Sequence, residues 1–246
     1  MMQPRFITPD IRPRWGNEYR AHKAAAILTT LRHFSTFDLA DADWLDIGCG
    51  SGGIAAVLAA HSRHMTGIDP EPWPDWPGLM QQNSNLTLYP GSYTTQPVPT
   101  QSADVVICNQ VYEHVPDPVR LIRFIYDTLR PGGLAYFAGP NLLFPIEPHT
   151  LWPFVHWLPR RLAGGLMRAC GSRKVLDAYS TTYWKLHRWL ADFEVINAVP
   201  YILHNPADHG RERLPWRLLA AVPPSILDAF TCLSPAFVFV LRKPGR

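Results

Sequence analysis

The residues with the clearest chemical potential lie at a glycine-rich turn. The run Trp44–Gly53 reads WLDIGCGSGG, a short apolar strand that leads directly into a cluster of glycines. Glycines let the backbone pass close to a ligand, and a helix that begins after such a turn offers its free N–H groups to that ligand. Gly48, Gly50 and Gly53 also match the G-x-G-x-x-G spacing of dinucleotide-binding turns. The turn therefore predicts a site for a nucleotide-type cofactor.

Two carboxylates flank this turn and narrow the choice of cofactor. Asp46 lies two residues before the first glycine, where its charge repels a pyrophosphate but suits a cationic amino or sulfonium group. Asp69 ends the next predicted strand, where a carboxylate can accept hydrogen bonds from both hydroxyls of a ribose. Asp69 fits either class of cofactor, whereas Asp46 favours a cationic one.

Four sequence blocks over about residues 40–140 carry a family resemblance. They are WLDIGCGSGG, TGIDPE, ADVVICNQVYEHVPDP and LRPGGLAYFAGPN, in that order. Together they resemble the class I S-adenosylmethionine-dependent methyltransferases, especially the small-molecule branch that is similar to ubiquinone-biosynthesis methyltransferases. The resemblance implies S-adenosyl-L-methionine as the cofactor. It also implies an α/β fold: a Rossmann-like, mainly parallel seven-stranded sheet flanked by helices, with a helical lid inserted after the fifth strand.

The resemblance further implies roles for individual residues near the cofactor. In the family the position after a glycine beyond the third strand often carries an acid that binds the adenine amino group. Here that place reads Ser92-Tyr93, and a serine accepts a hydrogen bond without supplying charge. The implied cofactor-binding set comprises Asp46, Gly48, Gly50 and Ser51 at the methionine portion, Asp69 at the ribose, Pro70, Ser92 and Tyr93 at the adenine, and Asn109 and Gln110 beside the methyl group.

Methyl transfer from a sulfonium needs alignment and exclusion of water more than covalent help. A base is needed only where the acceptor must lose a proton. The predicted catalytic pair is Glu147 and His149, in the segment that follows the fifth strand, with His156 as the second choice. His114, in the run Tyr-Glu-His-Val, is expected to have a structural or cofactor-cleft role. No metal site is predicted.

The elements that must position these residues alternate between helix and strand. A helix over 18–33 precedes strands at 43–47, 64–69, 86–89, 103–108 and 134–138. Such alternation indicates right-handed crossovers and a mainly parallel sheet. The remaining predicted elements are helices over 53–62 and 117–130, a turn at 131–133, and, after residue 179, helices over 180–191, 211–221 and 225–230 with strands over 193–199 and 236–241.

One domain is the simplest organisation for a chain of 246 residues. We divide it into a helical segment (1–40), a cofactor-binding half (41–140), a lid insertion (141–179) and a C-terminal part of the sheet (180–246). Residues 1–140 carry 13 acidic and 10 basic side chains, whereas residues 141–246 carry 7 acidic and 13 basic ones. The two halves are therefore expected to meet different partners.

Composition excludes several classes of protein. The chain is 47% hydrophobic and has a net charge of only +3, which is unlike a disordered chain or a nucleic-acid-binding arm. It has no stretch of 18 uncharged apolar residues, so no membrane-spanning helix is expected. Four widely spaced cysteines and an opening segment unlike a signal peptide predict a cytoplasmic protein with reduced thiols.

The lid insertion is aromatic and basic, which bears on the acceptor. A segment of this kind can shelter an apolar substrate, meet an anionic one or rest on a membrane surface. We expect a small-molecule acceptor that is lipid-linked, quinone-like or saccharide, with peripheral membrane contact through the lid and no nucleic-acid partner. The oligomeric state stays open. Two alternatives remain: an NAD(P)-dependent oxidoreductase, and a methyltransferase homologue that binds the cofactor without catalysis.

Overall fold

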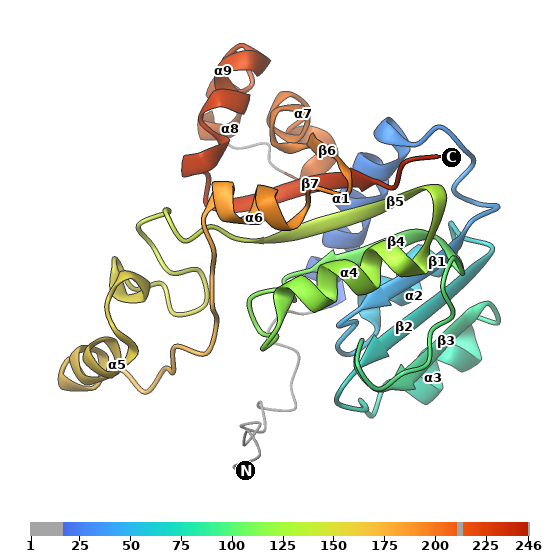
Figure 1. The fold of residues 1–246 in the computed structure, drawn as a ribbon, viewed down its shortest axis with the longest axis horizontal. Coiled ribbons are helices and arrows are strands. Elements are labelled where there is room, and N and C mark those ends of the chain that lie inside the picture. Colours follow the sequence, from blue (N-terminus) through green and yellow to red (C-terminus); the bar gives the residue numbers. More distant parts are fainter. Residues whose placement is uncertain (1–16, 211–213, 246) are drawn as a thin grey trace.

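The computed structural model describes residues 17–210 and 214–245. Residues 1–16, on which the expectation about a signal peptide rests, and the start of the predicted helix 211–221 lie outside this range. Seven strands of the described part form one sheet in the order β3-β2-β1-β4-β5-β7-β6 (Figure 1). They are β1 (Asp43–Ile47), β2 (His64–Asp69), β3 (Leu86–Pro90), β4 (Ala103–Asn109), β5 (Leu129–Pro140), β6 (Glu194–Asn197) and β7 (Ala236–Arg242).

Strands β1 to β5 are parallel to one another, and β7 runs antiparallel to both of its neighbours, β5 and β6. This confirms the predicted Rossmann-like, mainly parallel seven-stranded α/β sheet. The chain leaves β1 toward β2 and β3 on one side and later crosses to β4 on the other side. Because the crossovers diverge there, the carboxyl ends of β1 and β4 border a crevice of the kind that binds ligands in open α/β sheets.

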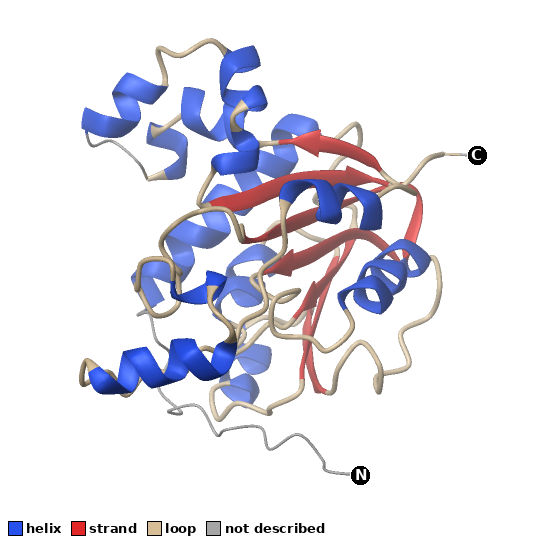
Figure 2. Ribbon diagram, turned by 60° about the vertical axis from the view of Figure 1, so that its left-hand side comes forward, coloured by secondary structure: helices blue, strands red, loops and turns tan. Residues whose placement is uncertain are grey.

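Helices cover both faces of the sheet, as Figure 2 shows. The buried core on one face includes residues of α1, α2, α3 and α7, and the core on the other face includes residues of α4 and α6. The helices are α1 (Asn17–Phe34), α2 (Gly53–Ala59), α3 (Trp76–Gln82), α4 (Pro118–Thr128), α5 (Arg160–Ala169), α6 (Tyr183–Trp189), α7 (Val199–His204), α8 (Leu214–Leu219) and α9 (Pro224–Ala229), with 3₁₀ turns η1 (Val155–Trp157), η2 (Ala207–His209) and η3 (Thr231–Leu233).

Several details of the predicted elements were wrong, among them the ends of the predicted helices 117–130 and 180–191 and of the predicted strand 193–199. The Pro131–Gly133 segment is part of β5 and not a separate turn, because the Gly132 N–H donates to the Lys243 carbonyl and the Lys243 N–H donates to the Gly133 carbonyl. Helices α3 and α7 were missed. Both carry a proline in the first turn, where a missing N–H costs no helical hydrogen bond. Helix α2 ends at Ala59 and does not reach residue 62.

The segment 141–179 that follows β5, called the insertion below, is built differently from the sheet. It holds η1 and α5, and α5 lies away from the strands in Figure 1. Its own small core consists of Val155, Ala163 and Met167, with Trp152 and Leu176 packed against it. No helix in the described part of the chain is both long and apolar enough to cross a membrane.

Candidate cofactor and acceptor site

The glycine turn after β1 has the left-handed backbone conformation that glycine adopts readily. Gly48 and Gly50 have φ angles of 71° and 54°, in the left-handed region that favours glycine. A Cβ on Gly48 would lie 2.7 Å from the Val111 side chain, whereas a Cβ on Gly50 would meet no atom within 4 Å. Gly48 is therefore needed for packing, and Gly50 leaves space beside the backbone for a ligand.

Asp46 is the buried acid of this site. It is the fourth of the five residues of β1, near the carboxyl end of the strand, and is only 4% exposed. Burial, with a smaller contribution from the negative charge of Asp69, raises the pKa of Asp46 to about 8. An ionised carboxylate in such a place needs a cation beside it. The α-ammonium group of a methionine moiety is a cation of this kind.

Asp69, at the end of β2, is tied to the glycine turn. Its Oδ2 accepts a hydrogen bond from Gly50 N at 2.8 Å, and its Oδ1 accepts one from Glu71 N at 3.0 Å. The burial of this carboxyl group raises its pKa, and the hydrogen bonds from Glu71 and Gly50 act in the opposite direction. These two bonds fix the orientation of the carboxylate while its remaining lone pairs stay available to hydroxyl donors.

Trp76 also holds the turn, and the sequence interpretation missed it. Its indole N–H donates to the Gly50 carbonyl at 2.9 Å, and its ring is buried in the core beneath α3. The available signal was the run EPWPDW at residues 71–76, with its two tryptophans, shortly after Asp69. A buried indole N–H usually finds a partner, and here that partner is the turn itself.

Two buried polar atoms of the predicted cofactor set have no hydrogen-bond partner within residues 17–210 and 214–245. They are Ser51 Oγ, beside the turn, and Asn109 Oδ1, at the end of β4. Buried polar groups in proteins are normally satisfied, so unpaired ones need an explanation. With the open space at Gly50 and the buried Asp46, they fit a polar cofactor that binds along the carboxyl ends of β1 and β4.

The residues predicted for the adenine end are placed less clearly. The Gly91 N–H donates to the Asp69 carbonyl at 2.7 Å, which brings the end of β3 beside the end of β2. Ser92 Oγ lies 2.8 Å from Thr94 Oγ1 within its own turn, and the Tyr93 hydroxyl donates to the Asp117 carbonyl at 3.2 Å. Pro70 is exposed next to Asp69. Their contact with an adenine stays a prediction.

Gln110 follows Asn109 with a φ angle of 60°, and its N–H donates to the Ala138 carbonyl at 2.7 Å. A left-handed conformation is uncommon for a residue other than glycine. It turns the chain out of β4 and into the loop 110–117, which contains Glu113 and His114. This loop leads from β4 to α4 and contacts the insertion, because the Tyr179 N–H donates to the Glu113 carbonyl.

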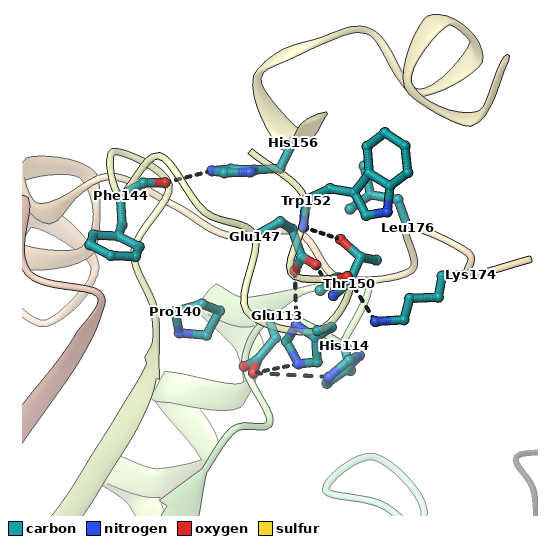
Figure 3. Close-up of polar contacts among 12 residues, drawn as sticks. Glu113, His114, Pro140, Phe144, Glu147, Thr150, Trp152, His156, Lys174 and Leu176 are labelled. Carbon is teal, nitrogen blue, oxygen red and sulfur yellow. Dashed lines mark hydrogen bonds and ion pairs between the residues drawn. The ribbon is translucent and has the colours of Figure 1, made fainter. Parts of the chain in front are cut away.

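The predicted catalytic pair is brought together. His149 Nδ1 lies 3.0 Å from Glu147 Oε1, and Thr150 N donates to Glu147 Oε2 (Figure 3). Burial would raise the pKa of Glu147, but the hydrogen bonds from His149 and Thr150 outweigh it and hold that pKa at about 2. The same bond to Glu147 raises the pKa of His149. Glu147 therefore orients the imidazole and leaves its Nε2 facing the loop 110–117.

Glu113 faces that imidazole, and the sequence interpretation did not single it out. Its side chain is 0% exposed, and burial raises its pKa to about 7. Its Oε1 lies 3.8 Å from His149 Nε2 and 3.9 Å from His114 Nε2. The rings of His114 and His149 meet edge to face, with centroids 5.0 Å apart. The only sequence signal was the Glu-His pair at positions 113 and 114.

His156 is not part of this cluster. Its Nε2 lies within hydrogen-bonding distance of the Leu142 and Phe144 carbonyls, at 3.1 and 2.9 Å, and Figure 3 shows it turned toward Phe144. Cys49, in the glycine turn, and Cys108, in β4, are not available as nucleophiles. Burial raises the pKa of the Cys49 and Cys108 thiols, so both remain protonated at neutral pH.

Comparisons with known proteins identify the family. A family model described as a methyltransferase domain matches residues 17–196. The chain belongs to this methyltransferase family. Its cofactor is S-adenosyl-L-methionine, as the resemblance implied.

A ubiquinone biosynthesis O-methyltransferase from Coxiella burnetii is 31% identical over 113 residues. The match covers 44% of this chain and 47% of the relative, so the chain spans just under half the length of the curated relative it matches. A match of less than half of each protein leaves the acceptor open.

Solved structures support the same methyltransferase fold. A phosphoethanolamine N-methyltransferase 2 from Haemonchus contortus, in complex with phosphomonomethylethanolamine and S-adenosylhomocysteine, superposes with a TM-score of 0.56 at 16% identity. That alignment covers 89% of this chain and 52% of the other. The [4+2]-cyclase SpnF superposes with a TM-score of 0.53 at 17% identity, covering 91% and 81%. Because a methyltransferase and a cyclase share it, the fold alone does not determine the reaction.

Proposed function

We propose that this protein transfers a methyl group from S-adenosyl-L-methionine to a small-molecule acceptor. The observation that carries the proposal is the buried Asp46 carboxylate beside an open glycine turn with two unpaired polar atoms. This arrangement suits a cationic amino acid moiety and disfavours a pyrophosphate, which argues against the NAD(P)-dependent alternative.

Bound S-adenosyl-L-methionine supplies a methyl group activated on a sulfonium sulfur. In the proposed site Asp46, Gly48, Gly50 and Ser51 hold the methionine portion. Asp69 accepts hydrogen bonds from the ribose hydroxyls, and Pro70, Ser92 and Tyr93 border the adenine. Asn109 and Gln110 lie beside the reacting carbon, where they orient the cofactor and exclude water. Assigned in this way, the two buried oxygens that lack partners both face the cofactor.

His149 and Glu147 are the proposed catalytic pair at the acceptor. The acceptor atom bonds to the methyl carbon as the sulfur–carbon bond breaks, and an acceptor hydroxyl loses its proton in the process. Glu147 positions the imidazole of His149 at 3.0 Å. We expect His149→Gln to lower kcat by at least tenfold with little change in cofactor affinity. Unchanged kcat would remove His149 from the acceptor site.

We propose an acceptor of the lipid-linked, quinone-like or saccharide class. The resemblance to ubiquinone biosynthesis O-methyltransferases and the aromatic, basic insertion favour the quinone-like member. The test has two stages: calorimetry with S-adenosylhomocysteine, NADH and NADPH, and then transfer of labelled methyl groups to dihydroxyphenyl, quinol and sugar acceptors. Binding of S-adenosylhomocysteine with labelling of one acceptor class supports the proposal. Binding of a nicotinamide cofactor alone contradicts it, and S-adenosylhomocysteine binding without labelling of any class favours the non-catalytic alternative.

Peripheral contact of the insertion with an anionic membrane is part of the proposal. Leu162 and Leu166 lie one turn apart on the outer side of α5 and are 62% and 47% exposed. Residues 148–176 contain no acidic side chain and five basic ones. An exposed apolar stripe with basic flanks is typical of helices that lie in a membrane interface. A lipid-linked acceptor would be reached from that surface, next to a cytoplasmic cofactor pool.

Vesicle sedimentation tests this contact. We expect the wild type to bind vesicles with phosphatidylglycerol and the Leu162→Ser/Leu166→Ser variant to bind them at least tenfold less. Arg161→Glu should weaken binding as well. Arg160 is unsuitable for this test because its guanidinium donates to the Leu176 and Ala178 carbonyls. Leu218→Ser, at an equally exposed leucine of α8, is the matched control. Equal binding by the control and the double variant contradicts the contact.

A further inference from the structure

Glu113 is a buried acid. Its side chain is fully buried, and neither Oε1 nor Oε2 has a hydrogen-bond partner from another residue in the described part of the chain. A buried charge without a partner is costly, and proteins usually satisfy it with hydrogen bonds, an opposite charge or a metal ion. The methyl donor explains Asp46, but the cofactor residues proposed above do not include Glu113. The charge of its ionised form is therefore balanced by the groups that face it or by an ion bound between them.

Two imidazoles face this carboxylate from separate parts of the chain. Glu113 Oε1 lies 3.8 Å from His149 Nε2 and 3.9 Å from His114 Nε2, and one ligand atom from each of the three residues falls within a 4.8 Å cluster. Glu113 and His114 come from the loop after β4, whereas His149 comes from the insertion. A backbone hydrogen bond joins the two segments, since the Tyr179 N–H donates to the Glu113 carbonyl at 2.7 Å.

Glu147 gives His149 the orientation of a metal ligand. Its carboxylate lies 3.0 Å from Nδ1 of His149, on the side of the ring opposite to the Nε2 that faces Glu113. Ligating histidines in metalloproteins commonly donate their second ring N–H to a carboxylate, which fixes the tautomer and the ring orientation. Glu147 is itself held, since Thr150 N donates to its Oε2 and the Leu151 N–H to its carbonyl oxygen.

We infer that Glu113, His114 and His149 form a binding site for a divalent first-row metal ion such as Zn²⁺, Co²⁺ or Mn²⁺. Two imidazoles and one carboxylate favour these ions over Mg²⁺ or Ca²⁺, which prefer oxygen ligands. An ion with ligands at about 2.1 Å in tetrahedral geometry brings the donor atoms to about 3.4 Å from one another. Small rotations of the two histidine side chains bring the donor atoms to this distance. His114 is exposed, so its side chain can rotate into space that solvent occupies.

Three protein ligands leave at least one coordination position open, which is the pattern of catalytic sites. This step rests on the proposed methyl transfer. An acceptor hydroxyl at the open position has its pKa lowered by the ion and releases its proton to water before the oxygen bonds to the methyl carbon. His149 and Glu147 then act on the acceptor through the ion, and the acceptor class narrows to small molecules with a coordinating oxygen.

Direct ion binding tests the site without any acceptor. Tag-free protein is treated with EDTA and titrated by calorimetry with ZnCl₂, and with CoCl₂ while the visible absorption is recorded. We expect one equivalent to bind saturably to the wild type, with ligand-field bands for Co²⁺. Glu113→Gln and His149→Ala should weaken the binding by at least a hundredfold, and Glu147→Gln, which removes only the orienting carboxylate, by about tenfold to a hundredfold.

The controls separate this site from other histidines and from misfolding. His64→Asn changes an exposed histidine at the start of β2 and should leave the affinity within twofold. His114→Ala, on the exposed loop, is the second ligand variant should a core variant fail to fold. Absence of stoichiometric binding by the wild type overturns the inference. So does an affinity equal to that of the wild type in both the His149→Ala and the His114→Ala variants.

Activity gives an independent readout once an acceptor is found. If the ion carries the acceptor, EDTA abolishes methyl transfer and Zn²⁺, Co²⁺ or Mn²⁺ restores it, while S-adenosylhomocysteine affinity stays unchanged. Failure of the proposed function looks different, because the ion then binds but no methyl group is transferred. Full activity in the metal-free protein would contradict the catalytic part of the inference.

Discussion

The cofactor side of the molecule and the insertion rest on very different amounts of core. The strands that carry Asp46 and Asp69 belong to a continuous hydrophobic core with buried residues from six strands and four helices, whereas the separate hydrophobic cluster of the insertion has only three buried residues. Precise alignment of a cofactor needs rigid support, and contact with a variable acceptor tolerates a more adaptable segment. The difference indicates that the sheet is more stable than the insertion, which is the proposed acceptor side.

Two buried acids, Asp46 and Glu113, lie in different surroundings. Asp46 lies near the carboxyl end of β1, and its ionised form is proposed to pair with a positive charge of the cofactor. Glu113 lies in the loop that joins the regions and faces two imidazoles. Burial raises the pKa of the Cys108 thiol, and the charges of Glu113 and Asp46 raise it further. Both acids are therefore near Cys108 of β4.

The largest effect is expected from Asp46→Asn. The amide keeps the shape of the side chain but removes the charge that pairs with the ammonium group. Loss of one partner of a buried ion pair costs about 3 kcal/mol or more, so S-adenosylhomocysteine should bind at least about a hundredfold more weakly in calorimetry. Asp41→Asn, at an exposed aspartate just before β1, should bind normally. Equal affinities of the two variants would remove Asp46 from the cofactor site.

A pair of buried methionines tests the difference in core size. Met65 in β2 and Met167 in α5 are 0% and 1% exposed. Met65→Ala should lower the free energy of unfolding by about 2–5 kcal/mol. Met167→Ala should leave global unfolding within about 1 kcal/mol of the wild type, because the insertion can open locally, and should speed hydrogen exchange in residues 150–176. Chemical denaturation and exchange mass spectrometry measure both. Equal global losses would mean that the insertion unfolds with the sheet.

The pH dependence of cofactor binding sharpens the role of Asp46. Its pKa in the free protein is about 8, and only the ionised form pairs with an ammonium group. Affinity should therefore rise with pH up to about 8 and fall on acidification, roughly a hundredfold at two pH units below the pKa. Calorimetry in buffers of different ionisation enthalpy should detect one proton released on binding at pH 7. An Asp46→Asn variant should lose this pH dependence.

The smallest effect is expected from Trp76→Phe. This change keeps an aromatic ring in the core and removes the indole donor to the Gly50 carbonyl. A lost hydrogen bond of this kind costs about 0.5–1.5 kcal/mol, so cofactor affinity should fall a few-fold, with a similar decrease in stability. Trp44→Phe is the matched control, because its indole N–H donates to the Leu39 carbonyl at 3.1 Å, away from the glycine turn. An equal loss of cofactor affinity in the Trp44 variant would mean that the bond from Trp76 to Gly50 has no specific role at the turn.

The sheet was predictable because its signals are local. Strand β1 and strand β2 begin and end at the predicted residues, since each is a short apolar run bounded by glycine, proline or acidic residues. Helices α3 and α7 were missed because their prolines read as breaks, although a proline in the first helical turn costs nothing. The Pro131–Gly133 segment was misread because its strand pairing depends on Lys243, more than a hundred residues away.

The sequence by itself determined the family, the glycine turn with its two acids, and the pairing of Glu147 with His149. These features depend on residues that are close in the chain, where spacing and type already fix the geometry. Only the tertiary structure shows that Glu113 and His114 lie beside His149. Only the tertiary structure shows that His156 lies outside this cluster. Those contacts join the loop after β4 to the insertion through packing and burial, which no local pattern records.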